Sequence, residues 1–186
     1  MLGNILQKMG HILRGGNSAQ QEMKYLLEHG LKIGNNFQSY SPYAFDANWP
    51  WLISVGDDVM LSTNVKILAH DASTNYIGAH TKIGCVTIGN KVFIGTGSII
   101  LCNTHIGNNV VIGAGSVVSH DIPDNSVAAG NPARVIYTMD EFRKKHQQEL
   151  KDHPYFNKYK WNEWRNASPE DWEEMRKALD GTYGYV

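Results

Sequence analysis

A six-residue repeat runs through the middle of the chain. One column of it consists of β-branched aliphatic residues: Ile88, Ile94, Ile100, Ile106, Ile112 and Val118. Glycine follows this column in four of these six units. Earlier segments, around Ile33 and from Val55 to Ile67, match the same template. Because helices repeat every 3.6 residues and strands every two, a period of six indicates a coil of short strands.

Three six-residue units would make one triangular turn of a parallel coil, with the aliphatic side chain directed inward. Successive turns would stack about 4.8 Å apart, the ordinary spacing between strands. The glycines, together with Asn90, Asn108 and Asn109, are expected at the corners, where the backbone needs positive φ. Each turn buries its core only against its neighbours. The sequence therefore predicts a mainly β solenoid whose ends need covering.

The repeat divides the chain into three regions. We predict a helical cap over residues 1–30, the coil over residues 31–137 and a helical, aromatic-rich tail over residues 138–186. In the cap, apolar residues recur at helical spacing over residues 1–14, without the unbroken apolar core of a signal peptide. A second cap helix presents Met23 and Leu26 on one face.

The tail predicts a charged helix over residues 139–151 and a helix from Ser168-Pro169 to about Asp180. Between them, residues 153–164 are dense in aromatic side chains. Three interpretations stay open: an arm around a neighbouring subunit, an additional acceptor surface, or packing on a coil, which we favour.

Composition excludes several classes of protein. A net charge of −1 provides no general basic surface for nucleic acid. No apolar run approaches the about 18 residues that a transmembrane segment requires. Two cysteines are too few for a disulfide framework or a cysteine zinc site. We therefore expect a cytoplasmic location and no metal.

One stretch carries a family resemblance. It is the run Ile106-Gly-Asn-Asn-Val-Val-Ile-Gly-Ala-Gly-Ser-Val-Val-Ser-His-Asp-Ile-Pro-Asp-Asn-Ser-Val-Ala-Ala-Gly-Asn-Pro-Ala-Arg134. This run resembles the acetyl-CoA-binding part of the hexapeptide-repeat acyltransferases, in their sugar O-acetyltransferase branch. The resemblance covers roughly residues 33–137. It implies a left-handed parallel β-helix, acetyl-CoA as co-substrate, and a homotrimer with active sites between subunits. The left hand comes from the resemblance alone, since crossover connections are usually right-handed.

A slip in the repeat marks a candidate catalytic residue. From Val55 to Ile88 is 33 residues, not a multiple of six, which predicts a loop leaving the coil over residues 71–82. His70 stands just before this loop and matches the family's catalytic histidine at the end of Val-Lys-Ile-Leu-Ala-His-Asp. A neutral imidazole can deprotonate a hydroxyl near neutral pH. Asp71 is a candidate to orient the imidazole, as is a backbone carbonyl.

Other positions are candidates for binding acetyl-CoA. Arg134 matches the family's phosphate-contacting basic residue, and the alternative is an ordinary surface arginine. By the same matching, Thr96 and Ala114 fall where the family contacts pantetheine. Ser119 and His120 occupy a pair that is often Thr-Lys, and His120 lacks a permanent charge.

The acceptor side is sought in residues 40–52, where aromatic residues surround Asp46 and Asn48. Such rings stack on a sugar while a carboxylate accepts hydrogen bonds from its hydroxyl groups. The alternative is a packed aromatic loop. His80, in the loop over residues 71–82, is a further candidate contact to the acceptor.

The resemblance implies an acetyl-CoA-dependent O-acetyltransferase acting on a sugar or a surface-polysaccharide precursor, with His70 as general base. An N-acetyltransferase on an amino sugar or nucleotide sugar is the close alternative, because the same base serves an amine. A non-catalytic trimeric scaffold is the alternative from another class. A metal between subunits, as in the family of γ-class carbonic anhydrase, requires closely spaced histidines that the repeat does not contain.

Overall fold

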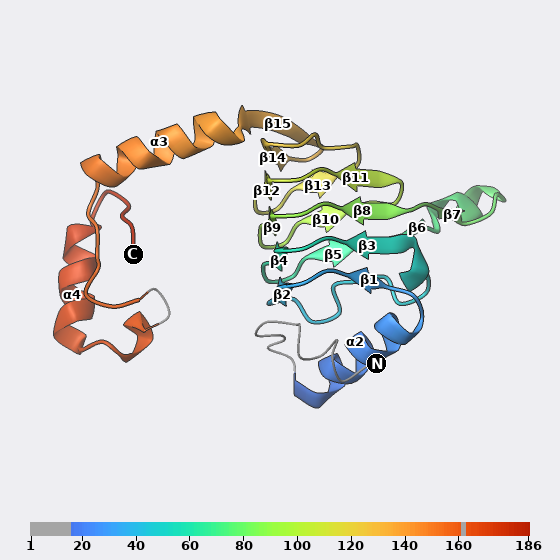
Figure 1. Ribbon diagram of the computed structural model, residues 1–186, viewed down its shortest axis with the longest axis horizontal. Coiled ribbons are helices and arrows are strands. Elements are labelled where there is room, and N and C mark those ends of the chain that lie inside the picture. The colour runs from blue at the N-terminus through green and yellow to red at the C-terminus, as the bar shows by residue number, and fades with distance from the viewer. Residues whose placement is uncertain (1–15, 161–162) are drawn as a thin grey trace. The chain divides into compact units, whose positions relative to one another are not determined.

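The computed structural model describes residues 16–160 and 163–186 and divides into two compact units, Met1–Met139 and Asp140–Val186. The helix expected over residues 1–14 lies outside the described residues. In the first unit, helix α2 (Gly16–Glu28) precedes a stack of short strands (Figure 1). The strands before the loop are β1 (Lys32–Ile33), β2 (Gln38–Ser39), β3 (Ile53–Val55), β4 (Met60–Leu61) and β5 (Lys66–Ile67), with the 3-10 helix η1 (Pro50–Leu52) before β3.

The later strands of the first unit continue the same stack. They are β8 (Val86–Ile88), β9 (Val92–Ile94), β10 (Ile99–Ile100), β11 (Thr104–Ile106), β12 (Val110–Ile112), β13 (Val117–Val118), β14 (Ser126–Gly130) and β15 (Ala133–Thr138). Three sheets result, in the orders β1-β3-β8-β11, β2-β4-β9-β12-β14-β15 and β5-β10-β13. All their pairs are parallel except β14 with β15. Successive strands visit the three sheets in turn, so each circuit of the chain makes one three-sided turn, as the repeat predicts.

The repeated aliphatic column forms the core. Ile88 pairs in register with Ile106, and Ile100 pairs with Val118. All the aliphatic residues of this column are buried. The position four residues after each of these aliphatic residues is buried as well. In some units it holds a small polar residue, such as Ser98. The inward direction predicted for the column is therefore confirmed.

The repeated glycines serve close approach between turns and not positive φ. A Cβ on Gly89 would lie 2.7 Å from the carbonyl oxygen of Gly107 in the next turn, closer than Cβ atoms pack. Positive φ falls instead on residues such as Asn109, at 55°, and Asn125, at 56°. The sequence places the corners correctly, but the reason it gives for these glycines is wrong.

The phase slip corresponds to an insertion. Asp57 and Asn90, hydrogen-bonded in adjacent turns, are 33 residues apart, whereas Asn90 and Asn108 are 18 apart. The additional residues form strand β6 (His70–Asp71), the 3-10 helix η2 (Ser73–Ile77) and strand β7 (Lys82–Ile83). Strands β6 and β7 pair antiparallel, so the insertion leaves the coil as a hairpin (Figure 1).

Helix α2 lies against the first turn of the coil. Met23 and Leu26 are buried in the same hydrophobic cluster as Leu31 and Phe37. Because the aliphatic column of the first turn has no preceding turn to pack on, this apolar helix face takes that place.

The second unit contains α3 (Met139–Asp152), the 3-10 helix η3 (Trp164–Asn166) and α4 (Pro169–Ala178). The predicted start of α4 is confirmed, because Ser168 caps it by accepting a hydrogen bond from the Asp171 N–H at 3.1 Å. None of the helices within the described ranges is long and apolar enough to cross a membrane. That the tail packs on a coil stays a prediction.

Candidate active site

His70 stands where the coil meets the inserted hairpin. It begins β6, directly after Ala69, which is fully buried. Across the hairpin, His70 pairs with Ile83, and the Gly84 N–H donates to the Ala69 carbonyl at 3.0 Å. Strand pairing and this hydrogen bond therefore join the two ends of the hairpin where it leaves the coil. The His70 side chain is 27 % exposed, so the imidazole lies at the surface of the coil with one side open.

The carboxylate of Asp46 contacts the imidazole of His70. Its Oδ2 forms a very short contact with His70 Nδ1 and accepts a hydrogen bond from the Ala69 N–H at 3.0 Å, while its Oδ1 accepts from the Asn48 N–H at 3.1 Å. Only 2 % of the Asp46 side chain is exposed. Its backbone is set by a parallel bridge between Phe45 and Ile67, which adds residues 44–46 beside β5. The fold therefore holds this carboxylate in one orientation.

Trp49 covers part of the imidazole. Its ring centroid lies 4.6 Å from that of His70, with the planes at 47°. Trp49 is half-buried, and it directly precedes η1. An aromatic ring at this distance limits the access of water to one side of the imidazole. This contact strengthens the electrostatic interaction between His70 and Asp46.

The contact with Asp46 fixes which imidazole nitrogen can act as a base. An ionised carboxylate accepts hydrogen bonds and donates none, so Nδ1 of His70 must carry the proton that Asp46 accepts. The neutral ring then has an unprotonated Nε2. A base of this kind can accept a proton from a hydroxyl group or an amine, and the buried carboxylate stabilises the imidazolium that results.

Asp71 does not take the orienting role that the sequence suggests. Its carboxylate accepts a hydrogen bond from the Ser73 N–H at 2.9 Å and lies 3.8 Å from Lys82 Nζ. The hydrogen bonds from Ser73 are the main reason that the pKa of Asp71 is lowered. Neighbouring residues on a strand point to opposite faces, so the Asp71 side chain turns away from the side on which Asp46 lies. The expected orienting residue is corrected from Asp71 to Asp46.

Two of the candidate acceptor-binding residues lie on the two segments that meet at this site, Asn48 in the segment before η1 and His80 in the inserted hairpin. Asn48 is exposed and uses its backbone N–H to fix Asp46. His80 is exposed in the hairpin, where its carbonyl oxygen accepts a hydrogen bond from Thr74 Oγ1 at 2.6 Å. Binding of the acceptor by Asn48 and His80 stays a prediction. Asp46 is buried, and its two oxygens contact His70 and backbone N–H groups, so its carboxylate does not face an acceptor surface.

Thr96 and Ala114 occupy one corner of the coil in successive turns. Gly115, next to Ala114, donates its N–H to the Thr96 carbonyl at 2.8 Å. Both Thr96 and Ala114 are exposed, and the Thr96 hydroxyl lies 2.7 Å from Ser62 Oγ. This corner is therefore exposed, and contacts with pantetheine stay a prediction.

Ser119 and His120 follow β13 on the sheet that also contains β5 and β10. Ile100 pairs with Val118 on one side and with Ile67 on the other, so Ser119 lies in the same column as Leu68. Two turns separate them, which corresponds to about 10 Å. Ser119 Oγ lies 2.9 Å from His120 Nδ1. These residues therefore share one edge of the coil with the segment that leads to His70.

Arg134 lies on β15, paired antiparallel opposite Ala129 of β14. It is exposed, and its guanidinium donates to the neighbouring Ala133 carbonyl at 2.9 Å. The remaining donors of the guanidinium fork are suited to phosphate oxygens. A phosphate role for Arg134 stays a prediction. Among residues 16–160 and 163–186, no three His, Cys, Asp or Glu side chains gather as a metal site would require.

Comparison with known proteins identifies the family. The family of bacterial transferase hexapeptide (six repeats) matches residues 85–120. Protein CapG of Staphylococcus aureus is 39 % identical over 140 residues, which span 72 % of this chain and 79 % of that protein. This chain is a hexapeptide-repeat transferase. The expected family is confirmed.

Solved structures place this hexapeptide-repeat transferase among the acetyltransferases. A maltose O-acetyltransferase of Clostridium difficile 630 superposes with a TM-score of 0.53 at 32 % identity, over 68 % of this chain and 78 % of that one. A hexapeptide-repeat acetyltransferase of Vibrio cholerae, solved with acetyl-CoA, has a TM-score of 0.54 at 20 % identity, over 72 % and 97 % of the two chains, and shows the same fold. The transferase is an acyltransferase enzyme, as expected.

Two features of the hexapeptide-repeat transferase site do not follow from its sequence. The aromatic segment around Trp49 suggests a sugar platform, but the structure places Trp49 against the catalytic candidate. The sequence also suggests Asp46 as a contact to the acceptor, but this residue holds the imidazole. The signal available for Asp46 is the pair Ala44-Phe45 before it, which is buried as a strand would be. That signal gives the burial of this segment but not the partner of the carboxylate.

Proposed function

We propose that this enzyme transfers an acetyl group from acetyl-CoA directly to a hydroxyl of a sugar or of a surface-polysaccharide precursor, with His70 as general base and Asp46 as the residue that positions it. The observation that carries the proposal is the contact between Asp46 and His70 Nδ1, which leaves Nε2 as the available base beside the inserted hairpin. The sugar class is supported by the maltose O-acetyltransferase, and the donor by the acetyltransferase solved with acetyl-CoA.

The reaction then needs one group, the His70 imidazole, to carry the proton from the acceptor hydroxyl to the departing sulfur. Acetyl-CoA supplies the acetyl group as an activated thioester. As the acceptor oxygen forms its bond to the acetyl carbon, Nε2 of His70 accepts the hydroxyl proton, and Asp46 stabilises the resulting charge on the ring. The carbon–sulfur bond breaks, and the proton passes from His70 to the departing sulfur. His70 is thereby neutral again with the proton on Nδ1, ready for the next acceptor.

The remaining site residues complete the proposal. Backbone groups at Thr96 and Ala114 contact the pantetheine arm, Ser119 and His120 lie along the same edge of the coil as His70, and Arg134 binds phosphate. We propose that the coil is left-handed and that three copies assemble with the active sites between subunits. Exposed apolar residues on the coil unit, among them Phe93 at 40 % and Ile83 at 52 %, are available to such an interface. Asn48 and His80 contact the acceptor, and a cytoplasmic location fits the donor.

The test is acetyl-CoA turnover over a panel of sugars, amino sugars and nucleotide sugars. We expect transfer to a sugar hydroxyl, and we expect His70→Ala to stay folded while turnover falls by at least about 10²-fold, the lower limit for a positioned general base. Unchanged turnover in His70→Ala would remove the mechanism. Transfer only to amino groups would replace the O-acetyl assignment by an N-acetyl one, and no turnover with any acceptor would favour a scaffold.

A further inference from the structure

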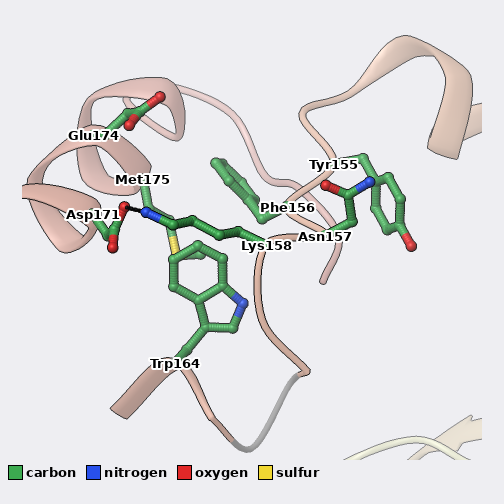
Figure 2. A pocket seen from close by; sticks show the side chains of 8 residues that line it. All are labelled: Tyr155, Phe156, Asn157, Lys158, Trp164, Asp171, Glu174 and Met175. Carbon is green, nitrogen blue, oxygen red and sulfur yellow. Dashed lines mark hydrogen bonds and ion pairs between the residues drawn. The ribbon is translucent and has the colours of Figure 1, made fainter. Parts of the chain in front are cut away.

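A small pocket lies within the C-terminal unit, formed by none of the residues proposed for acetyl transfer. Its volume is about 150 Å³. Its lining is Tyr155, Phe156, Asn157, Lys158, Trp164, Asp171, Glu174 and Met175 (Figure 2). Pockets that take drug-sized ligands span roughly 300–1,000 Å³, so this one suits a single small ring.

Hydrogen bonds hold the pocket in shape. Asp171 is buried at the start of α4 and forms a very short ion pair with Lys158, which Figure 2 shows reaching across to it. Asp171 also accepts from the Tyr159 hydroxyl at 3.0 Å. On the other side, the Phe156 N–H donates to the Tyr185 carbonyl at 2.8 Å. A ligand entering the pocket therefore meets walls that are already ordered, which lowers the cost of binding.

Two walls of the pocket are aromatic. The rings of Phe156 and Trp164 are 5.9 Å apart at 85°, so they present faces in two directions. The Trp164 Nε1 is buried and has no hydrogen-bond partner in the described part of the chain, so Trp164 offers its ring and not its donor. Aromatic faces of this kind pack against the apolar C–H surfaces of a ligand.

Two polar side chains of the lining are free to bind. Glu174 and Asn157 have no hydrogen-bond or ion-pair partner within residues 16–160 and 163–186. Figure 2 shows them on opposite sides of the Phe156 ring, Glu174 from α4 and Asn157 from the irregular segment between α3 and η3. A carboxylate accepts hydrogen bonds, and an amide both donates and accepts. A ligand carrying several hydroxyl groups has both the donors and the acceptors that these two side chains can use.

Charge narrows the class of ligand. The Lys158 ammonium is neutralised by its ion pair with Asp171, so the charge that remains at the pocket is that of the Glu174 carboxylate, which would repel an anion. We propose that this pocket binds one neutral sugar ring, which stacks on the Phe156 and Trp164 faces and hydrogen-bonds to Glu174 and Asn157. The C-terminal unit then carries a sugar-binding pocket whose lining includes none of the residues proposed for acetyl transfer. This is the second of the roles open to the tail, an additional acceptor surface.

The experiment is a ligand-observed NMR titration of the full chain with four probes: the methyl glycosides of glucose, galactose, mannose and N-acetylglucosamine. We expect at least one probe to bind with a millimolar dissociation constant. Glu174→Gln should weaken that binding by about tenfold, because a hydrogen bond to a charged carboxylate becomes a weaker one to a neutral amide. Asn157→Ala should weaken it in the same direction, and far-UV circular dichroism checks that each variant is folded.

Two controls test whether the glycoside binds in this pocket. Glu173→Gln makes the same change one residue earlier on α4, outside the lining, and should leave binding within about twofold. His70→Ala should bind the probe as the unchanged protein does, whatever its turnover. The proposal is overturned if no glycoside binds, if Glu173→Gln weakens binding as much as Glu174→Gln, or if His70→Ala abolishes it. Binding of tetramethylammonium in place of the glycosides would overturn it too, and would identify a cation cage instead.

Discussion

His70 contacts Asp46, which is 24 residues away in the sequence, and not Asp71, which directly follows it. We expect Asp46→Asn to lower kcat by about 10²–10⁴-fold, because an amide can donate to Nδ1, moves the ring proton to Nε2 and leaves no base. It also removes the charge that stabilises the imidazolium. Steady-state kinetics with acetyl-CoA and the best acceptor of the panel measure the loss.

Asp71→Asn is the matched control for this residue. Its carboxylate faces Ser73 and Lys82, so we expect kcat to stay within about threefold of the unchanged enzyme. Equal losses in the two variants would contradict the assignment, since the effect would then follow charge near the ring and not the contact with Nδ1. A larger loss in Asp71→Asn would restore Asp71 as the orienting residue.

How far the sequence predicts this site depends on the separation of its residues. His70 could be found because it stands beside a slip in a regular repeat. Its partner could not, because Asp46 is 24 residues away and reaches the ring only through the bridge between Phe45 and Ile67. The six-residue step from Ile33 through Ser39 does reach Phe45, but it says nothing of which side chain the neighbouring Asp46 contacts. The repeat therefore identifies His70 as a candidate and does not identify Asp46 as its partner.

At the scale of the strands and their corners, one corner of the coil carries a ladder of polar side chains. Asn36 Nδ2 donates to Asp58 Oδ1 at 2.7 Å, and Asn109 Nδ2 donates to Asn125 Oδ1 at 2.7 Å. All four residues have positive φ. Lys91 occupies the turn between the two pairs with a φ of 56°, and its side chain continues neither of them. The ladder is therefore interrupted at one rung.

Replacing Lys91 by Asn should complete this ladder. Asn adopts the left-handed conformation more readily than Lys, and its amide can bond to the residues above and below. We expect Lys91→Asn to raise the free energy of unfolding by about 0.5–1 kcal/mol, in the range of other conformational substitutions. Chemical denaturation measures the change. Lys32→Asn, the same substitution on strand β1, should give no gain, and a loss of stability at Lys91 would show that the ladder does not govern this corner.

The strands themselves are the most predictable part of the fold. An aliphatic residue that must be buried at every sixth position predicts a coil of short strands. Ile88, Ile100 and Ile112 are buried as this prediction requires. The close approach of the backbones of successive turns could not be predicted from the repeat. Gly89 is required by the carbonyl of Gly107, and the distance between two turns is a property of their packing that no single repeat contains.

At the scale of the whole molecule, the C-terminal unit has its own stabilising network. Its central residue is Asp171, which contacts Lys158, Tyr159 and Ser168. The hydrogen bond from Lys158 is the main cause that lowers the pKa of Asp171 to about 2. The same residues shape the pocket proposed to bind sugar. The acid stability of this unit therefore reports on the integrity of the pocket.

Asp171→Asn should destabilise the C-terminal unit in a pH-dependent way. The folded-state pKa lies below the value of about 3.9 expected for an unfolded Asp, so the ionised carboxylate stabilises the folded unit above that pH, and its contribution is lost as pH falls toward 2. The unfolding midpoint of Asp171→Asn should thus lie below that of the unchanged protein at about pH 5–7, and the two should converge as the pH falls from about 4 to about 2. Tryptophan fluorescence measures the midpoint. Trp164 and Trp172 belong to this unit and Trp49 and Trp51 to the coil unit, so the transition that is compared is the one that Asp171→Asn shifts at about pH 5–7. Asp180→Asn, at a carboxylate beyond α4, should show no such convergence. A difference that stays constant down to about pH 2 would mean that the network depends on packing of the Asp171 side chain and not on its charge.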